Sequence, residues 1–174
     1  MDPTTQQALT QAGAFAAIGF AAVGSALGCG AAGTAAVGAW KKCYAQDRPA
    51  PFQLAVFAGA PLSQTIYGMI LMFVIAGKAS FTEQGAVLAT AASWPVLLVL
   101  GVLAGIAMGI SAWMQGRAAA GACDAFAETG QGFTNYLMAL GIIETVAIFV
   151  MAFAIVLLTS VSIPEAASLA AAAM

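Results

Sequence analysis

The chain alternates four long apolar stretches with short polar ones. Each apolar stretch exceeds the roughly 20 residues that a helix needs to cross a bilayer, and none shows the strict alternation of a membrane strand. In hydrocarbon the backbone groups must be paired within the segment, as they are in a helix. The pattern therefore predicts an all-α membrane protein with four transmembrane helices. The apolar stretches are 12–40, 53–77, 95–122 and 136–161, separated by turn and charge signals at 41–51, 78–84 and 123–132.

The composition agrees with a lipid environment and excludes several classes of protein. Hydrophobic residues make up 62% of the 174 residues, and five basic and seven acidic side chains cannot cover a water-facing surface. The net charge of −2 excludes a nucleic-acid binder, and the absence of histidine excludes a histidine-ligated metal or a Ser-His pair. Cys29, Cys43 and Cys123 form no CxxC motif, and we interpret them as small packing residues.

The basic residues predict how the chain is oriented in the membrane. Lys41, Lys42, Arg48 and Arg117 lie in or near the first and third connections, whereas Lys78 lies at the opposite end. Cytoplasmic loops carry an excess of Lys and Arg. We therefore expect the first and third connections to be cytoplasmic and both termini to be extracytoplasmic.

The two halves of the chain resemble each other. Residues 33–39 (GTAAVGA) align with 116–122 (GRAAAGA) at five of seven identical positions, and a second alignment pairs Gln64 with Glu144. Each half is therefore predicted to be a helical hairpin, repeated in parallel orientation. The predicted organisation is a first hairpin (1–77), an extracytoplasmic connection (78–94) and a second hairpin (95–174).

The first and third stretches are rich in small residues at four-residue spacing. In lipid, helices associate through the close contact that small residues permit. Two interpretations follow: tight packing within a four-helix monomer, or an inner ring of helices from many copies, which the glycine density favours. Bulky residues such as Leu71 and Phe149 are concentrated in the second and fourth stretches, which we expect to face lipid. The small residues are Gly24, Gly28, Gly101, Gly105, Gly109, Ala112, Gly116 and Ala120.

Glu144 is the one acid well inside an apolar stretch. A charge at the centre of a membrane helix costs about 3 kcal/mol on insertion scales, so an intramembrane acid is a functional hypothesis by default. The alternative is a protonated glutamic acid that serves as a hydrogen-bond donor between helices.

Further oxygen-bearing side chains are predicted at the same depth as Glu144. In the second stretch, helical spacing places four residues on one face, namely Ala60, Ser63, Gln64 and Tyr67. Pro61 lies among them and frees the backbone carbonyl four residues earlier. At about 1.5 Å per residue, the polar residues of three stretches lie roughly 10–17 Å from the same surface. The side chains predicted to share one ion site are those of Ser63, Gln64, Tyr67, Gln115 and Glu144.

This set of oxygens suits a small monovalent cation. One carboxylate cancels one positive charge, whereas a divalent ion would leave a net charge in lipid. A proton would need only the carboxyl group, so the additional amides and hydroxyls favour Na⁺ over H⁺. They could also satisfy a protonated Glu144.

At these residues the chain resembles the proteolipid, or rotor-ring subunit (K or c), of V-type and A/V-type rotary ATPases, in the sodium-translocating branch. The resemblance covers nearly the whole chain and includes the glycine-rich segments 24–33 and 105–122 and the single carboxylate within 141–153. It implies that Na⁺ ligands come from a Ser/Thr-Gln-x-x-Tyr stretch, a Gln-Gly-basic stretch and the carboxylate. It also implies that Ala60, three residues before Ser63, provides a backbone carbonyl to the predicted ion site. Ser63 stands where threonine is commoner and keeps the hydroxyl.

The resemblance also implies partners. Identical copies would form a homo-oligomeric ring that rotates in the lipid against a stator subunit with an essential arginine. A central-stalk subunit would contact the cytoplasmic loops and couple rotation to ATP hydrolysis elsewhere, since this chain has no GxxxxGK[ST] motif. The residues expected at the central stalk are Lys41, Lys42, Arg48, Asp124 and Glu128.

Two other classes of protein remain as alternatives. A small four-helix exporter could use Glu144 as a proton-coupled binding group, but a site for an organic cation should be lined with aromatic residues, and Tyr67 is the only one nearby. In a structural tetraspan protein the acid would be incidental. Either alternative predicts a monomer or dimer rather than a large homo-oligomer.

Overall fold

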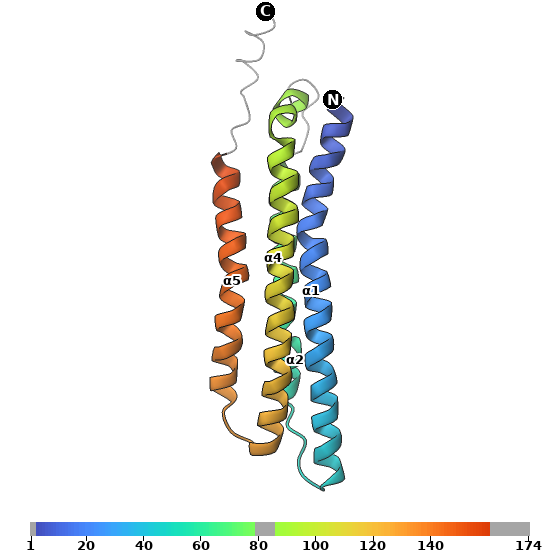
Figure 1. The fold of residues 1–174 in the computed structure, drawn as a ribbon, viewed down its shortest axis with the longest axis vertical. Helices are drawn as coiled ribbons and strands as arrows, with labels where there is room; N and C mark the ends of the chain where they lie inside the picture. The colour runs from blue at the N-terminus through green and yellow to red at the C-terminus, as the bar shows by residue number, and fades with distance from the viewer. Residues whose placement is uncertain (1–2, 79–85, 161–174) are drawn as a thin grey trace, which may run out of the picture.

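The chain folds into a bundle of long helices, which confirms the predicted all-α class. The computed structural model describes residues 3–78 and 86–160, with side chains described for 4–78 and 93–160. Four helical segments in this part of the chain are long and apolar enough to cross a membrane, so the protein is a multi-pass integral membrane protein (Figure 1). The elements are α1 (Pro3–Ala45), α2 (Leu54–Gly59), the 3₁₀ turn η1 (Ala60–Leu62), α3 (Ser63–Lys78), α4 (Ala86–Thr129) and α5 (Phe133–Ser160).

The helices extend beyond the predicted apolar stretches. α1 has 43 residues and α4 has 44, so each is about 65 Å long, twice the roughly 30 Å of hydrocarbon. Hydropathy marks where a helix leaves lipid, but the helix continues where its apolar face is still covered. Cys43 and Phe126, for example, are buried beyond the predicted ends of these stretches.

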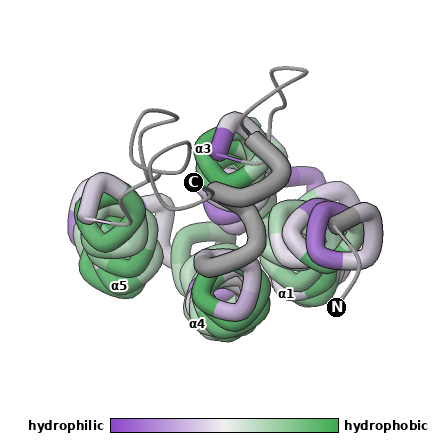
Figure 2. Tube along the Cα trace, turned by 90° about the horizontal axis from the view of Figure 1, so that it is seen from above, coloured by the Kyte–Doolittle hydropathy of each residue, from purple (hydrophilic) through white to green (hydrophobic). Residues whose placement is uncertain are grey.

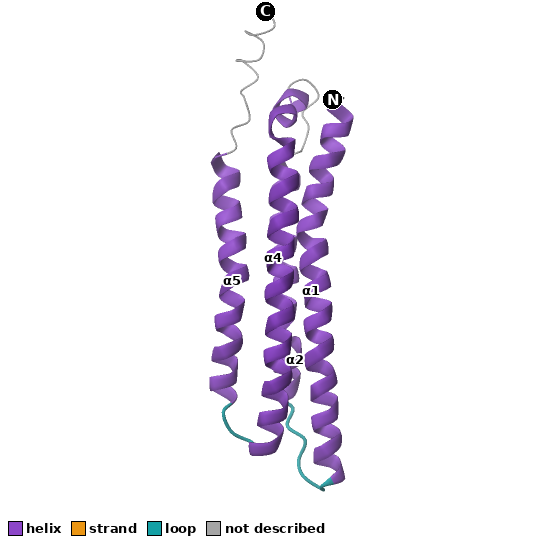
Figure 3. Cartoon of the chain, viewed as in Figure 1, coloured by secondary structure: helices purple, strands orange, loops and turns teal. Residues whose placement is uncertain are grey.

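The connections are correspondingly shorter than predicted. The loop predicted at 41–51 is confined to 46–53, and the one predicted at 123–132 to 130–132 (Figure 3). α4 begins at Ala86, nine residues before the predicted start at Pro95, and continues through this proline. Part of the predicted 78–94 connection (79–85) and the end of the second hairpin (161–174) lie outside the described residues.

The second membrane crossing is interrupted by one 3₁₀ turn at Pro61. Proline lacks an N–H and clashes with the carbonyl of the preceding turn, so the α-helical ladder cannot pass through it unchanged. The chain accommodates Pro61 by tightening Ala60–Leu62 into η1, and the α-helix resumes at Ser63. The irregular turn therefore directly precedes two of the predicted ion-binding residues, Ser63 and Gln64.

The helices form two layers. α1 and α4 pack side by side, α3 packs against both, and α5 packs against α4 and α3 (Figure 2). The two short loops lie at the same end of the bundle, opposite the end where α3 terminates at Lys78 (Figure 1). The described part of the chain thus consists of two hairpins packed together.

Glycines allow α1 and α4 to approach at backbone distance. A Cβ on Gly24 would lie 1.9 Å from the carbonyl oxygen of Gly109, and one on Gly116 would lie 2.1 Å from the Cα of Gly28. These four glycines therefore serve packing within one chain, as the monomer interpretation expects. At three other glycines of α1, an added Cβ would meet no atom within 4 Å among the described residues outside the helix's own backbone, namely Gly30, Gly33 and Gly38.

Two apolar clusters lie along the bundle. The cluster near the short loops includes Phe57, Phe126 and Leu140, and the other includes Leu71 and Met108. Leu71 is fully buried and does not belong to the expected lipid-facing layer, because it packs inward from α3. Phe73, Phe149 and Phe153 are exposed, as expected of an outer layer.

The connection between α4 and α5 depends on glycine. Gly130 and Gly132 have φ angles of 65° and 86°, which side-chain-bearing residues adopt reluctantly. Gly130 follows the last residue of α4 and donates its N–H to the Phe126 carbonyl at 2.8 Å, which caps the helix. The tight turn brings α5 back along α4 as the second arm of a hairpin.

Candidate functional site

A continuous chain of polar side chains crosses the bundle between the two apolar clusters. It begins at η1, where the Ser63 hydroxyl lies 3.2 Å from the Ala60 carbonyl oxygen and 3.2 Å from Gln64 Oε1. Ser63 is the first residue of α3, so its hydroxyl lies beside the distorted turn that Pro61 imposes. The predicted backbone donor at Ala60 therefore lies next to the predicted hydroxyl and amide donors of α3.

Two glutamines join α3 to α4 in the interior. Gln64 and Gln115 are both fully buried, and Gln64 Nε2 donates to Gln115 Oε1 at 2.8 Å. Burying an amide without a hydrogen-bond partner at this depth would cost folding free energy, so each polar atom of the two amides needs a partner. The pair satisfies part of this need and places both amides beside the carboxylate of α5.

The orientation of the Gln115 amide follows from its surroundings. Gln115 Nε2 lies 3.1 Å from the Leu140 carbonyl oxygen and 3.3 Å from Glu144 Oε2. Both partners accept hydrogen bonds, so the NH₂ group must face them. The Gln115 oxygen then faces Gln64, where it accepts one bond and keeps a second lone pair.

Glu144 receives hydrogen bonds on both carboxylate oxygens. Tyr67 Oη donates to Oε1 at 2.6 Å, and Gln115 donates to Oε2. Tyr67 is predicted as an ion ligand, and in this geometry its hydroxyl also holds the carboxylate in place. Glu144 is partly buried, and among the described residues the one ion pair, between Lys42 and Glu128, lies elsewhere. The structure thus brings all six predicted residues into one network, without a basic side chain paired to the acid.

Ser111 is a polar residue of this region that the sequence analysis did not single out. It is buried, and its Oγ donates to the Ile143 carbonyl at 3.0 Å. Its position four residues before Gln115 is a signal that could have found it, because residues at this spacing share a helix face. The carbonyl of Leu140 could not have been found in this way, since every residue has one.

The predicted central-stalk residues lie mostly on helices rather than in loops. Lys41 and Lys42 belong to the last turns of α1, Asp124 and Glu128 to the last turns of α4, and Arg48 to the loop. This corrects the predicted loop bounds, because both helices continue past the expected ends. Lys42 Nζ pairs with Glu128 Oε1 and links the ends of α1 and α4.

Comparison with known protein families identifies one domain. Residues 98–157 match the ATP synthase C-subunit family. The C-terminal half of this chain therefore contains an ATP synthase C-subunit domain. The match covers most of α4 and α5 and contains Ser111, Gln115 and Glu144, whereas Ser63, Gln64 and Tyr67 lie outside it. Comparison of the chain with curated proteins gives no match.

The C-subunit domain contributes the acid, and the rest of the chain contributes much of its polar surroundings. Gln115 and Glu144 lie on the two helices of the domain, while Gln64 and Tyr67 reach them from α3. The network depends on both hairpins, so the domain alone would leave the Gln115 oxygen and one carboxylate oxygen without these partners.

Proposed function

We propose that the protein is the rotor-ring (proteolipid) component of a V-type, sodium-transporting rotary ATPase. Each protomer carries one Na⁺ on Glu144 past the stator as the ring rotates. The observation that supports this most directly is a single carboxylate at membrane depth that accepts two hydrogen bonds and has no basic partner among the described residues. The C-subunit domain that contains it supports the rotor role.

The chemistry of the network supports a transported monovalent cation. Glu144 accepts a hydrogen bond on each of its two oxygens, as an ionised carboxylate does, because it has no proton to donate. An ionised acid in lipid needs a counter-charge, and one cation cancels it. Oxygen lone pairs for Na⁺ remain on Gln115, Gln64, Ser63 and the Ala60 carbonyl, which fits the preference of hard cations for oxygen.

The proposed cycle uses partners that this chain lacks. At the stator, an arginine would displace Na⁺ from Glu144 by supplying a second positive charge to the same carboxylate. Beyond the stator, the empty site would take up Na⁺ again from the other side of the membrane. Lys41, Lys42 and Arg48, with Asp124 and Glu128, would meet the central stalk at the cytoplasmic end. ATP hydrolysis would take place in other subunits.

A hydrophobic carbodiimide should label Glu144 selectively, and Na⁺ should protect it at neutral pH. The reagent partitions into lipid, where Glu144 lies, whereas Glu128 is exposed and paired with Lys42. Bound Na⁺ would occupy the carboxylate oxygens and exclude the proton that the carboxyl group needs in order to add to the reagent. Mass spectrometry of the labelled enzyme in its membrane, in NaCl and in choline chloride of equal ionic strength, measures this. Labelling that Na⁺ does not reduce and that rises as the pH falls would assign H⁺ as the coupling ion, and failure to label Glu144 would contradict the site.

Gln115→Ala should weaken Na⁺ binding roughly 10- to 150-fold while the oligomer stays intact. The substitution removes one oxygen ligand and the amide that bonds Glu144 Oε2, and hydrogen bonds to charged groups contribute about 1.5–3 kcal/mol. The Na⁺ concentration that half-protects Glu144 from the carbodiimide gives the affinity, and native electrophoresis gives the assembly. Gln131→Ala, in the exposed turn, is the matched control. Unchanged affinity in Gln115→Ala would show that Gln115 is not a ligand.

A further inference from the structure

Two hydrogen bonds join α4 to the backbone of α5 at the depth of Glu144. Gln115 Nε2 donates to the Leu140 carbonyl at 3.1 Å, and Ser111 Oγ donates to the Ile143 carbonyl at 3.0 Å. The two donors lie four residues apart on α4, and the two acceptors lie three residues apart on α5. Both contacts therefore connect one face of each helix over about one turn.

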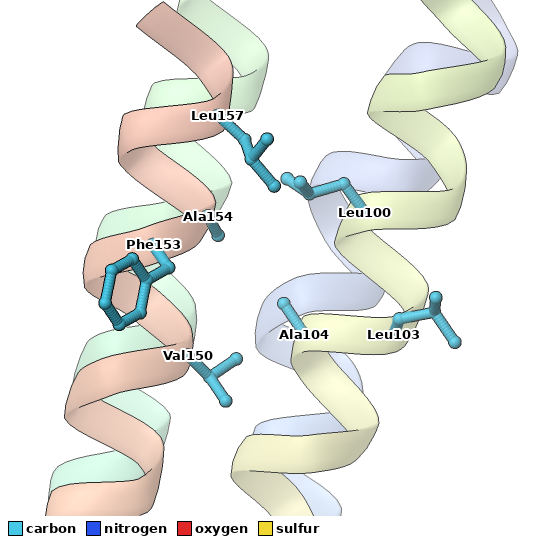
Figure 4. A pocket seen from close by; sticks show the side chains of 7 residues that line it. All are labelled: Leu100, Leu103, Ala104, Val150, Phe153, Ala154 and Leu157. Carbon is cyan, nitrogen blue, oxygen red and sulfur yellow. The ribbon is translucent and has the colours of Figure 1, made fainter.

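These bonds are important because α5 packs against α4 less closely than α1 does. α1 and α4 meet at backbone distance through Gly24, Gly28, Gly109 and Gly116. Between α4 and α5, by contrast, there is an apolar crevice of ≈ 270 Å³, whose lining side chains Figure 4 shows. The crevice lies on the side of the site away from the short loops. It is lined by Leu100, Leu103, Ala104, Val150, Phe153, Ala154 and Leu157.

Ser111 lies about two helical turns along α4 from Ala104, the nearest crevice residue in the chain, and it belongs to the same layer as the polar network. The α4 residues of the crevice precede Ser111 in the chain, and its α5 residues follow Ile143. Apolar contacts around a crevice specify the rotation of a helix weakly, whereas a directional hydrogen bond to one carbonyl specifies it well. The Ser111 bond thus fixes the rotation of α5 next to the residue that carries the acid.

We infer that Ser111 is a positioning residue for the ion site, which acts through the backbone of α5. This rests on the proposed function of Glu144 as the ion-binding carboxylate. Ile143 directly precedes Glu144, so its carbonyl and the carboxylate move together. A rotation of α5 by about 10° displaces an atom about 6 Å from the helix axis by about 1 Å. Such a shift would alter the distances from Glu144 to Tyr67 and Gln115. Binding sites tolerate displacements of their ligand atoms of only about 0.5 Å.

Ser111→Ala should raise the ion concentration that half-protects Glu144 from carbodiimide labelling by about 3- to 15-fold. This range corresponds to the hydrogen-bond energies measured between membrane helices. The measurement uses the assembled enzyme in its membrane and titrates Na⁺ at constant neutral pH. Ser111→Thr, which keeps a hydroxyl, should restore an affinity near the natural one. Native electrophoresis should show an unchanged oligomer in every variant.

Ser25→Ala is the matched control. Ser25 is also a buried serine, on α1, but its Oγ has no hydrogen-bond partner in the described part of the chain. Its replacement deletes the same atom without breaking a bond, so the affinity should stay within about twofold. Natural affinity in Ser111→Ala, or an equal loss in Ser25→Ala, would overturn the positioning role. If Na⁺ does not protect Glu144 in the natural protein, the proposed Na⁺ site itself fails, and this result is independent of Ser111.

Discussion

Glu144→Gln should abolish ion transport and leave the protein folded and assembled. Glutamine has nearly the shape of glutamic acid, and its amide oxygen can still accept the hydrogen bond from Tyr67. It cannot neutralise a cation, so a bound Na⁺ would carry an uncompensated charge in lipid at a cost of about 3 kcal/mol or more. ATP-driven ²²Na⁺ uptake into vesicles that contain the assembled enzyme should fall to background.

A carboxylate-to-amide change elsewhere provides the control for this experiment. Asp47 lies in the loop between α1 and α2 with φ 52°, a conformation that asparagine tolerates well. Asp47→Asn should therefore retain normal uptake. Normal uptake in Glu144→Gln, with the oligomer intact, would contradict the rotor proposal, because no other described acid lies in the network.

Gly24→Ala should force α1 and α4 apart and lower the stability of the bundle. The added Cβ would lie 1.9 Å from the Gly109 carbonyl oxygen and 2.3 Å from its Cα. These are backbone atoms, which cannot rotate away as the end of a side chain can. Overpacking costs about 1–3 kcal/mol in ordinary cores, and we expect the upper end of that range here. The resistance of the purified protein to thermal unfolding in mild detergent, followed by circular dichroism, measures the effect.

Gly30→Ala is the matched glycine on the same helix. Among the described residues, a Cβ at this position meets no atom within 4 Å outside the backbone of α1 itself, so the fold of the single chain should be unaffected. If Gly30→Ala reduced the oligomer on native electrophoresis without lowering the unfolding temperature, Gly30 would lie between copies, as the inner-ring interpretation expects. Equal stability of Gly24→Ala and the natural protein would contradict the close α1–α4 contact.

The sequence predicted the class of fold well because membrane helices leave a strong hydropathy signal. It predicted the helix ends poorly, since hydropathy reports contact with lipid and not the end of hydrogen bonding. Lys42 and Glu128 illustrate the difference, because both were expected in loops and instead form an ion pair between helices. The glycine pattern predicted close packing correctly, but it did not specify whether the partner was the same chain or another copy.

The candidate site was largely visible in the sequence because its residues are polar in apolar surroundings. Ser63, Gln64, Tyr67, Gln115 and Glu144 each stand out for this reason, and helical rise placed them at one depth. Their ion-binding role remains a prediction. Ser111 was overlooked because a hydroxyl in a membrane helix can bond its own backbone and is not exceptional there.

Polarity against hydrocarbon is a local property of each residue, and it was enough to identify the membrane class, the number of crossings and the residues that could bind an ion. The direction of each hydrogen bond, the pairing of Gly24 with Gly109 and the contact of Ser111 with Ile143 depend on how the helices rotate and cross. These features come from the packing of distant segments, which adjusts many weak contacts together, so the folded structure was required to establish them.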